Sequence, residues 1–337
     1  MTEFVGLCRN EWIKLWRHRR VAISLVGALA LGIAILNVLA TSHGGSWQDS
    51  VRVEIGQLKQ LEAQIARASS AGDLPSLPGD ATQVFARQLA LRQYLLAHDV
   101  APDSWYPLTG AATSVFVTSF PILLLLFAGL SAELLAQERN DETIALLLAR
   151  PVSRRAILMA KAVAVLAASL VVVLVGLVLT YVLGGVLHGG WDRFSGSVLV
   201  IKDPSLGPVL SNVVLLPGWS YALLSLGVSL LAVLMAVGFG LLVSTFSRRG
   251  GSAIALTIGG LFALPSMAGA LGPILHSPAW LHWFFFNQVM PAANLGDRAG
   301  PTTGLVGLGL SVAVLVGWAL LFYGGAILIF LRRDEIG

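Results

Sequence analysis

Six long apolar runs constrain this chain more than any other feature of its sequence. They cover residues 21–41, 111–135, 161–187, 220–246, 252–271 and 305–331. A run of about 20 apolar residues matches the roughly 30 Å hydrocarbon core of a bilayer. Lipid cannot satisfy bare backbone polar groups, so each run must be a helix or a strand of a closed barrel. Continuous runs without alternation exclude the barrel. The sequence therefore predicts an all-α integral membrane protein with six transmembrane helices.

The composition agrees with membrane insertion. Hydrophobic residues make up 56% of the 337 residues and charged residues only 12%, whereas soluble domains carry about 25% charged residues. The first run is about 20 residues long and has no clear small-residue cleavage site before His43, so we expect a retained anchor rather than a signal peptide. The single cysteine, Cys8, can form no internal disulfide.

The basic residues predict the orientation, because cytoplasmic loops are enriched in Lys and Arg. Of the 22 Lys and Arg residues, fourteen lie in the flanks that include both termini. Only three lie in the short loops of the opposite side, and the other five lie in one long loop that carries little weight. We therefore expect a multi-pass protein of the cell (cytoplasmic) membrane with both termini in the cytoplasm.

Residues 1–20 have the pattern of an amphipathic helix at the membrane surface. In EFVGLCRNEWIKLWRHRR, apolar side chains recur at helical spacing and cations fill much of the remainder. Indole rings favour the headgroup region and cations favour anionic lipid. The predicted membrane-interface anchors are Trp12, Trp16, Arg17, Arg19 and Arg20. The alternative is a simple basic flank that only sets topology.

Three segments are predicted on the extracytoplasmic side. Residues 42–110 hold two amphipathic patterns separated by AGDLPSLPGD, which predicts an extracytoplasmic helical hairpin. Residues 188–219 form an outer loop around SVLVIKD, read as a short strand or as irregular structure. Residues 272–304 are aromatic but broken by prolines, which favours a re-entrant or interfacial segment.

The most distinctive segment is the cytoplasmic stretch 136–160, AQERNDETIALLLARPVSRRAILMA. Mixed charges come first, then a short apolar piece, and then a proline turn in which Ser153 is placed to N-cap the third helix. The apolar piece is too short to span and too apolar for a free loop, so it should lie on the inner surface or in a groove of another protein. The alternative is that its cations only enforce topology.

Four features resemble the permease subunits of type 2 ABC transporters, in the bacitracin and multicopper-enzyme-maturation permease group. The first is the basic amphipathic start NEWIKLWRHRR, and the second is an outer hairpin that closes with YLLAHDVAP. The third is a pattern of a Glu, a Gly-Thr and a Leu pair, followed by RPVSR and a Lys. The fourth is a broken outer segment before the last span. The third is the most specific, and it runs here from Glu138 to Lys161. The family's Gly before Thr143 is Glu142 in this chain, which suggests a helix running straight through.

This resemblance implies a role for the 136–160 segment. In the family it docks on a separately encoded ATPase subunit, and the membrane-spanning halves work as pairs. The residues that would couple to the ATPase are Glu138, Arg139, Asp141, Glu142, Thr143, Leu147, Arg150, Pro151, Ser153, Arg154 and Arg155. The implied partners are that ATPase, a second permease copy or a similar permease, and membrane lipid, with no nucleic acid. ATP and Mg would sit on the partner, so no cofactor and no catalysis are expected on this chain.

Missing motifs exclude several other functions. The chain has no G-x-x-x-x-G-K-[ST] phosphate loop, no H-E-x-x-H and no G-x-S-x-G. The outer histidines match no standard metal-site spacing, so no metal site is predicted. No charged residue is expected deep in a span, which disfavours a self-powered secondary transporter. The second hypothesis is a membrane sensor or scaffold whose outer hairpin binds a ligand or an envelope partner. The residues do not select among a peptide antibiotic, a lipid and a hydrophobic drug as substrate.

Overall fold

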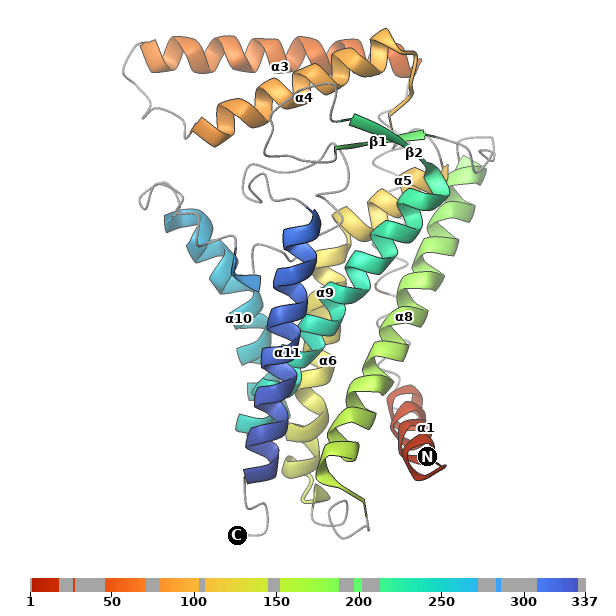
Figure 1. Ribbon diagram of the computed structural model, residues 1–337, viewed down its shortest axis with the longest axis vertical. Coiled ribbons are helices and arrows are strands. Elements are labelled where there is room, and N and C mark those ends of the chain that lie inside the picture. Colours follow the sequence, from red (N-terminus) through yellow and green to blue (C-terminus); the bar gives the residue numbers. More distant parts are fainter. Residues whose placement is uncertain are drawn as a thin grey trace.

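The described part of the chain is a helical bundle with one small antiparallel sheet (Figure 1). The computed structural model describes residues 2–17, 27, 46–70, 79–102, 107–144, 152–187, 197–201, 213–271, 283–285 and 308–332. Its helices are α1 (Thr2–Arg17), α3 (Trp47–Ser70), α4 (Gly79–Ala97), α5 (Pro107–Thr113), the π-helical turn η2 (Ser114–Thr118), α6 (Phe120–Asn140), α8 (Arg154–Leu187), α9 (Gly218–Phe246), α10 (Gly250–Leu271) and α11 (Leu308–Arg332). The strands are β1 (Ser197–Ile201) and β2 (Val213–Pro217).

Four of the described helices are long and apolar enough to cross a membrane, namely α6, α8, α9 and α11. In α10 the apolar stretch found by the same test is shorter, Gly250–Ala263. A mainly helical membrane protein is therefore confirmed, with β1 and β2 as the described strands. The first predicted span, 21–41, lies outside the described residues apart from Gly27, and the count of six spans stays a prediction.

Helices α6 and α9 pack closely at the centre of the bundle, and α8, α10 and α11 surround them (Figure 1). At Gly240 of α9, an added Cβ would collide with the side chain of Ser131 and the backbone of Ala128, both on α6. Small residues allow this approach of helix backbones in membrane proteins. Nearby, the Ser244 hydroxyl of α9 accepts hydrogen bonds from two backbone N–H groups of α6.

The predicted second span, 111–135, is not one continuous α-helix. Helix α5 ends at Thr113, η2 follows, and α6 begins at Phe120 and runs to Asn140. Pro121 explains the interruption, because proline has no N–H to donate and its ring collides with the carbonyl four residues earlier. The apolar run is present as predicted, but the break at Pro121 was not predicted.

The two sets of predicted loops lie at opposite ends of the bundle (Figure 1). Helices α3 and α4 and the two strands lie at one end, which we call the outer end after the predicted sidedness. Helix α1, the end of α6, the start of α8 and the C-terminal end of α11 lie at the other, the inner end. Helices α3 and α4 contact each other, and an ion pair joins Arg92 to Glu54 at 2.6 Å.

The outer segment 188–219 contains more regular structure than predicted. Strand β1 covers most of SVLVIKD and pairs antiparallel with β2, from Ser197 opposite Pro217 to Ile201 opposite Val213. Helix α9 then begins at Gly218, within the predicted loop. Of the predicted re-entrant segment 272–304, only residues 283–285 are described. There the Trp283 carbonyl accepts a hydrogen bond from the Trp318 indole of α11 at 2.8 Å.

Candidate functional site

The candidate site is built around the connection between α6 and α8, residues 141–153, which we call the α6–α8 connection. Helix α6 ends in a tight left-handed turn: Glu142 has φ 57°, its N–H donates to the Arg139 carbonyl at 3.1 Å, and the Thr143 N–H donates to the Glu138 carbonyl at 3.0 Å. These two bonds form a Schellman motif. The expectation that Glu142 would let the helix run straight through is therefore wrong. The turn that glycine favours is formed here by glutamate.

The other end of the connection begins α8. The Ser153 hydroxyl accepts a hydrogen bond from the Ala156 N–H at 3.3 Å, and the Ser153 carbonyl accepts one from the Ile157 N–H at 3.2 Å. The predicted N-cap is therefore confirmed. Helix α8 accordingly begins at Arg154, seven residues before the predicted third span, and α6 continues to Asn140, five residues past the predicted second span. Both ends of the predicted 136–160 segment thus belong to the long helices, and only residues 141–153 connect them.

Two arginines at the ends of this connection hold the C-termini of other helices. One Arg139 nitrogen, Nη1, donates to the carbonyls of Ser244, Thr245 and Ser247 at 2.8, 3.0 and 3.0 Å, at the end of α9. Arg154 donates from Nη1 to the Phe330 carbonyl in the last turns of α11 at 3.4 Å. The last carbonyls of a helix lack partners within the helix and carry partial negative charge, so an arginine satisfies both needs.

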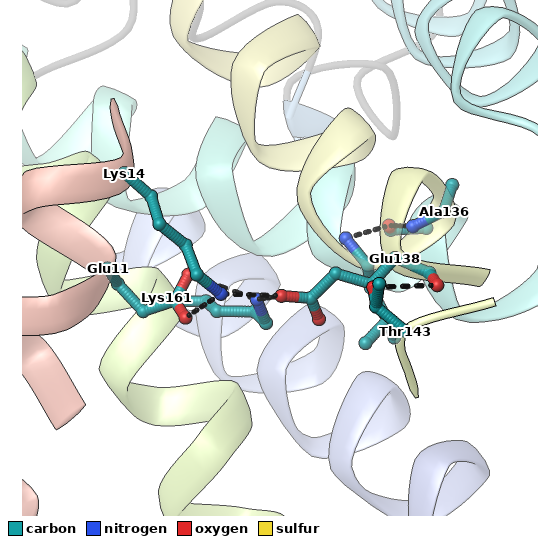
Figure 2. Close-up of polar contacts among 8 residues, drawn as sticks. Glu11, Lys14, Ala136, Glu138, Thr143 and Lys161 are labelled. Carbon is teal, nitrogen blue, oxygen red and sulfur yellow. Dashed lines mark hydrogen bonds and ion pairs between the residues drawn. The ribbon is translucent and has the colours of Figure 1, made fainter. Parts of the chain in front are cut away.

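A closed ring of two carboxylates and two ammonium groups joins α1, α6 and α8 just above the connection (Figure 2). Lys161 Nζ lies 2.7 Å from Glu138 Oε1 and 3.0 Å from Glu11 Oε2. Lys14 Nζ lies 3.0 Å from Glu11 Oε1 and 3.1 Å from Glu138 Oε1. We call these four residues the ion ring. Its formal charge is zero, which is what burial requires of ionised groups.

The ring is buried at Lys161 and Glu11 and open to solvent at Lys14. The exposed fractions of the side chains are 1% for Lys161, 5% for Glu11, 14% for Glu138 and 43% for Lys14. Burial alone would raise the pKa of Glu11, but the charges of Lys161 and Lys14 outweigh it and hold that pKa below its ordinary value. Burial alone would lower the pKa of Lys14, but the two carboxylates outweigh it and raise that pKa.

The ring changes the interpretation of the N-terminal helix. Leu7, Glu11 and Leu15 form the face of α1 that is buried, and α1 packs along α8. Trp12 is partly buried against the core, whereas Trp16 is 38% exposed. The helix predicted from residues 1–20 is present over Thr2–Arg17. Part of the face expected to lie in lipid contacts protein instead, and it carries a carboxylate.

The remaining predicted site residues divide into two groups. Those that the structure places on the surface at the inner end are Arg17, Asp141, Glu142, Thr143, Ser153 and Arg155. Those that lie outside the described residues are Arg19, Arg20, Leu147, Arg150 and Pro151.

Sequence reasoning missed three members of the ring. Glu11 was given no role, Lys14 was read only as one cation of an amphipathic helix, and Lys161 only as the end of the RPVSR pattern. A signal was available for Glu11, because it is the one acid within the cationic segment NEWIKLWRHRR and shares a helical face with Leu7 and Leu15.

The described residues contain no group of three or more His, Cys, Asp or Glu side chains that could hold a metal ion. The polar contacts at the inner end instead connect helices to one another. Charge-assisted hydrogen bonds join the ends of several helices at one short connection.

Comparison with known proteins places most of the chain in one family. The sequence model of the family described as "Protein of unknown function (DUF2705)" matches residues 86–336. The chain is also 25% identical to the "Uncharacterized protein YhcI" of Bacillus subtilis (strain 168), over 98% of this chain and 99% of the relative.

Proposed function

The chain belongs to the DUF2705 family of proteins of unknown function, and we propose that it is the membrane-spanning subunit of an ATP-driven exporter of the type 2 ABC class. In this proposal it works as a dimer with separate ATPase subunits in the cell membrane, with both termini in the cytoplasm. The ATPase binds at the α6–α8 connection and moves the helices that export the substrate.

One observation supports this proposal above the others: the ends of the connection are tied to five helices. The connection is covalently continuous with α6 and α8. Arg139 reaches the end of α9, Arg154 reaches the end of α11, and the ion ring reaches α1. A displacement imposed on this short segment would therefore be passed to all five helices, as coupling to an external motor requires.

The described ends of the connection suit a protein partner. Asp141, Glu142 and Thr143 are exposed at one end, and Ser153 and Arg155 are exposed at the other. Exposed charges of both signs favour a specific orientation of the partner and raise the rate of association. Glu142 and Arg155 are the residues to test, because neither takes part in the ion ring or in the contacts to α9 and α11.

The test is co-purification of an ABC-type ATPase subunit with the tagged chain from membranes of its native cells. We expect the wild-type chain to retain the ATPase, and the Glu142→Lys, Arg155→Glu double variant to lose most of it while its melting temperature is unchanged. Lys59→Glu, a charge reversal on exposed α3 at the outer end, is the matched control. The proposal is wrong if no ATPase co-purifies, or if the double variant retains as much as the control.

A second candidate is a membrane sensor or scaffold. The observation that favours it is the pair α3 and α4, which lie beyond the outer end of the membrane-embedded helices and are joined by the Glu54–Arg92 ion pair (Figure 1). The same experiment separates the two candidates. A sensor would co-purify with an envelope partner through α3 and α4, and its output would persist when the ATPase gene is deleted.

A further inference from the structure

One oxygen of the ion ring has no hydrogen-bond partner. Glu138 Oε1 accepts from both lysines, from Lys161 at 2.7 Å and from Lys14 at 3.1 Å. The other oxygen of this carboxylate, Oε2, is buried and has no partner among the described residues. An ionised carboxylate has lone pairs for about four hydrogen bonds, and a buried acceptor without a partner costs free energy. The ring therefore contains an unused acceptor beside Lys161.

This oxygen gives Lys161 a second possible arrangement. In the structure, Lys161 bridges Glu138 on α6 and Glu11 on α1, and its side chain is 1% exposed. If α1 moved away, Lys161 would lose Glu11, and a buried ammonium group needs a replacement because an unpaired buried charge is very costly. The unused Oε2 offers that replacement on Glu138 itself. Glu11 would leave together with Lys14, its partner on the same helix.

The two faces of α1 suit two different surroundings. Its buried apolar side chains, Leu7 and Leu15, lie on either side of Glu11 and face the bundle. The opposite face exposes apolar side chains and cations, namely Val5, Arg9, Ile13, Trp16 and Arg17. Such a face binds to a membrane surface that contains anionic lipid. An α1 helix that has left the bundle can therefore stay on the membrane.

Glu138 also links the ring to the α6–α8 connection (Figure 2). Its backbone carbonyl accepts hydrogen bonds from the Thr143 N–H at 3.0 Å and from the Thr143 hydroxyl at 3.2 Å. Thr143 is exposed and lies in the turn that ends α6. A shift of this turn would therefore move Glu138 and change the geometry of the ring.

We propose that α1 is a reversible latch, a helix that docks on the bundle and detaches from it, and that Glu138 allows it to detach. In the docked state, Lys161 bridges Glu11 and Glu138 and so joins α1, α6 and α8. In the undocked state, Lys161 binds both oxygens of Glu138, Glu11 pairs with Lys14, and α1 lies on the membrane surface. That the latch regulates movement of the connection rests on the proposed export function, whereas the undocking itself does not.

The test measures how fast the buried face of α1 reacts with iodoacetamide. Leu15 is 2% exposed, so the thiol of Leu15→Cys is reached only when α1 undocks. Cys8→Ser provides the background, because Cys8 is the only native cysteine. The sample is the purified full-length chain in lipid nanodiscs, without any ATPase. Glu11→Gln and Glu138→Gln are then compared in this background.

The two glutamine variants should have opposite effects. Glu11→Gln removes an acceptor that Lys161 uses only in the docked state, so labelling should become about tenfold faster. Glu138→Gln leaves Lys161 with Glu11 as its only carboxylate, so undocking should be suppressed and labelling should become about threefold slower or more. If the ring only fastened α1, both variants would lose ion pairs to α1 and both would label faster. Loss of a nearby negative charge favours the reactive thiolate in both variants, so it does not explain slower labelling.

A double variant checks the cause of the suppression. In Glu138→Gln, Lys161→Met, no lysine is left that needs Glu11, so labelling should return at least to the rate of the parent Leu15→Cys chain. Labelling of Glu138→Gln as fast as the parent would overturn the latch, and so would a double variant as slow as Glu138→Gln alone.

A further comparison leaves the ion ring intact, so it holds even if Glu138→Gln does not fold. Ala232 on α9 is 0% exposed, and Ala232→Cys in the same background reports opening of the bundle itself. Leu15→Cys should label about tenfold faster than Ala232→Cys, because α1 detaches without unfolding of the bundle. Equal rates at the two positions would overturn the latch. None of these measurements involves an ATPase, so failure of the latch is distinguishable from failure of the export function.

Discussion

Replacing Lys161 with methionine tests whether the ion ring holds the inner end together. Methionine keeps the length and apolar stem of lysine but removes the charge. The two shortest contacts of the ring on the buried side would be lost, at 2.7 Å to Glu138 and 3.0 Å to Glu11. Only Lys14, which is 43% exposed, would then remain to balance two carboxylates.

The size of the effect follows from burial. At an effective dielectric constant of 20, Coulomb's law gives about 5–6 kcal/mol for each of these contacts. Desolvation of the ions offsets much of this gain, and removal of one partner of a buried ion pair costs about 3–5 kcal/mol in practice. For a chain of this size, that corresponds to a fall in melting temperature on the order of 10 °C.

The assay is thermal melting of the purified chain in detergent, at one heating rate because membrane proteins often unfold irreversibly. Lys14→Met is the matched control within the same ring. Its side chain is largely exposed on one side, so we expect a loss of about 1 kcal/mol or less. If Lys161→Met melted within two degrees of the wild type, or if Lys14→Met lost as much, the ring would not stabilise the inner end as described.

Three further predictions concern the same helices. Gly240→Ala should destabilise the chain by about 1–3 kcal/mol, because its Cβ would collide with α6, whereas Gly227→Ala has open space and should melt at or above the wild-type temperature. Glu142→Gly should raise the free energy of unfolding by about 1 kcal/mol, because glycine adopts the left-handed backbone conformation of residue 142 without strain. Glu142→Ala should not raise it. Equal melting temperatures of the two variants would contradict this strain. The pKa of Glu11 lies below its ordinary value of 4.5, so its contribution is complete above 4.5 and is lost as the pH falls through the lowered value. The pKa of Lys14 lies above 10.5, so its contribution is complete below 10.5 and is lost at higher pH. The difference in melting temperature between the wild type and Glu11→Gln should therefore be constant from about pH 5.5 to 9.5 and shrink in acid. A change of this difference with pH between these limits would contradict the ring geometry.

The sequence predicted the four described helices that are long and apolar enough to cross a membrane, because each contains a long apolar run. Its errors lie at their ends. Helix α6 continues to Asn140, past the predicted span end at residue 135, whereas the start of α8 at Arg154 follows from the predicted Ser153 N-cap. The break before α6 depends on one proline, and a hydropathy pattern averages over it.

The candidate site was only partly predictable, for a related reason. The α6–α8 connection stands out locally through its charges and its proline. The ion ring does not, because it is assembled from residues 150 positions apart in the sequence, such as Glu11 and Lys161. Nothing in the local pattern says that Arg139 and Arg154 donate to the ends of α9 and α11. Such partners are set by the tertiary arrangement of helices, which the sequence pattern alone does not give.

The composition of the ion ring bears on how α1 can move. Glu11 and Lys14 lie on α1 itself, three residues apart and in contact. Glu138 and Lys161 form the shortest contact of the ring, between α6 and α8. The ring therefore divides along the α1 surface into two halves that are each neutral. Because an unpaired buried charge is the most costly product of breaking such a cluster, a division into neutral pairs lowers the cost of separating α1 from the bundle. A ring in which each carboxylate faced only a cation of the other helix would lack this property.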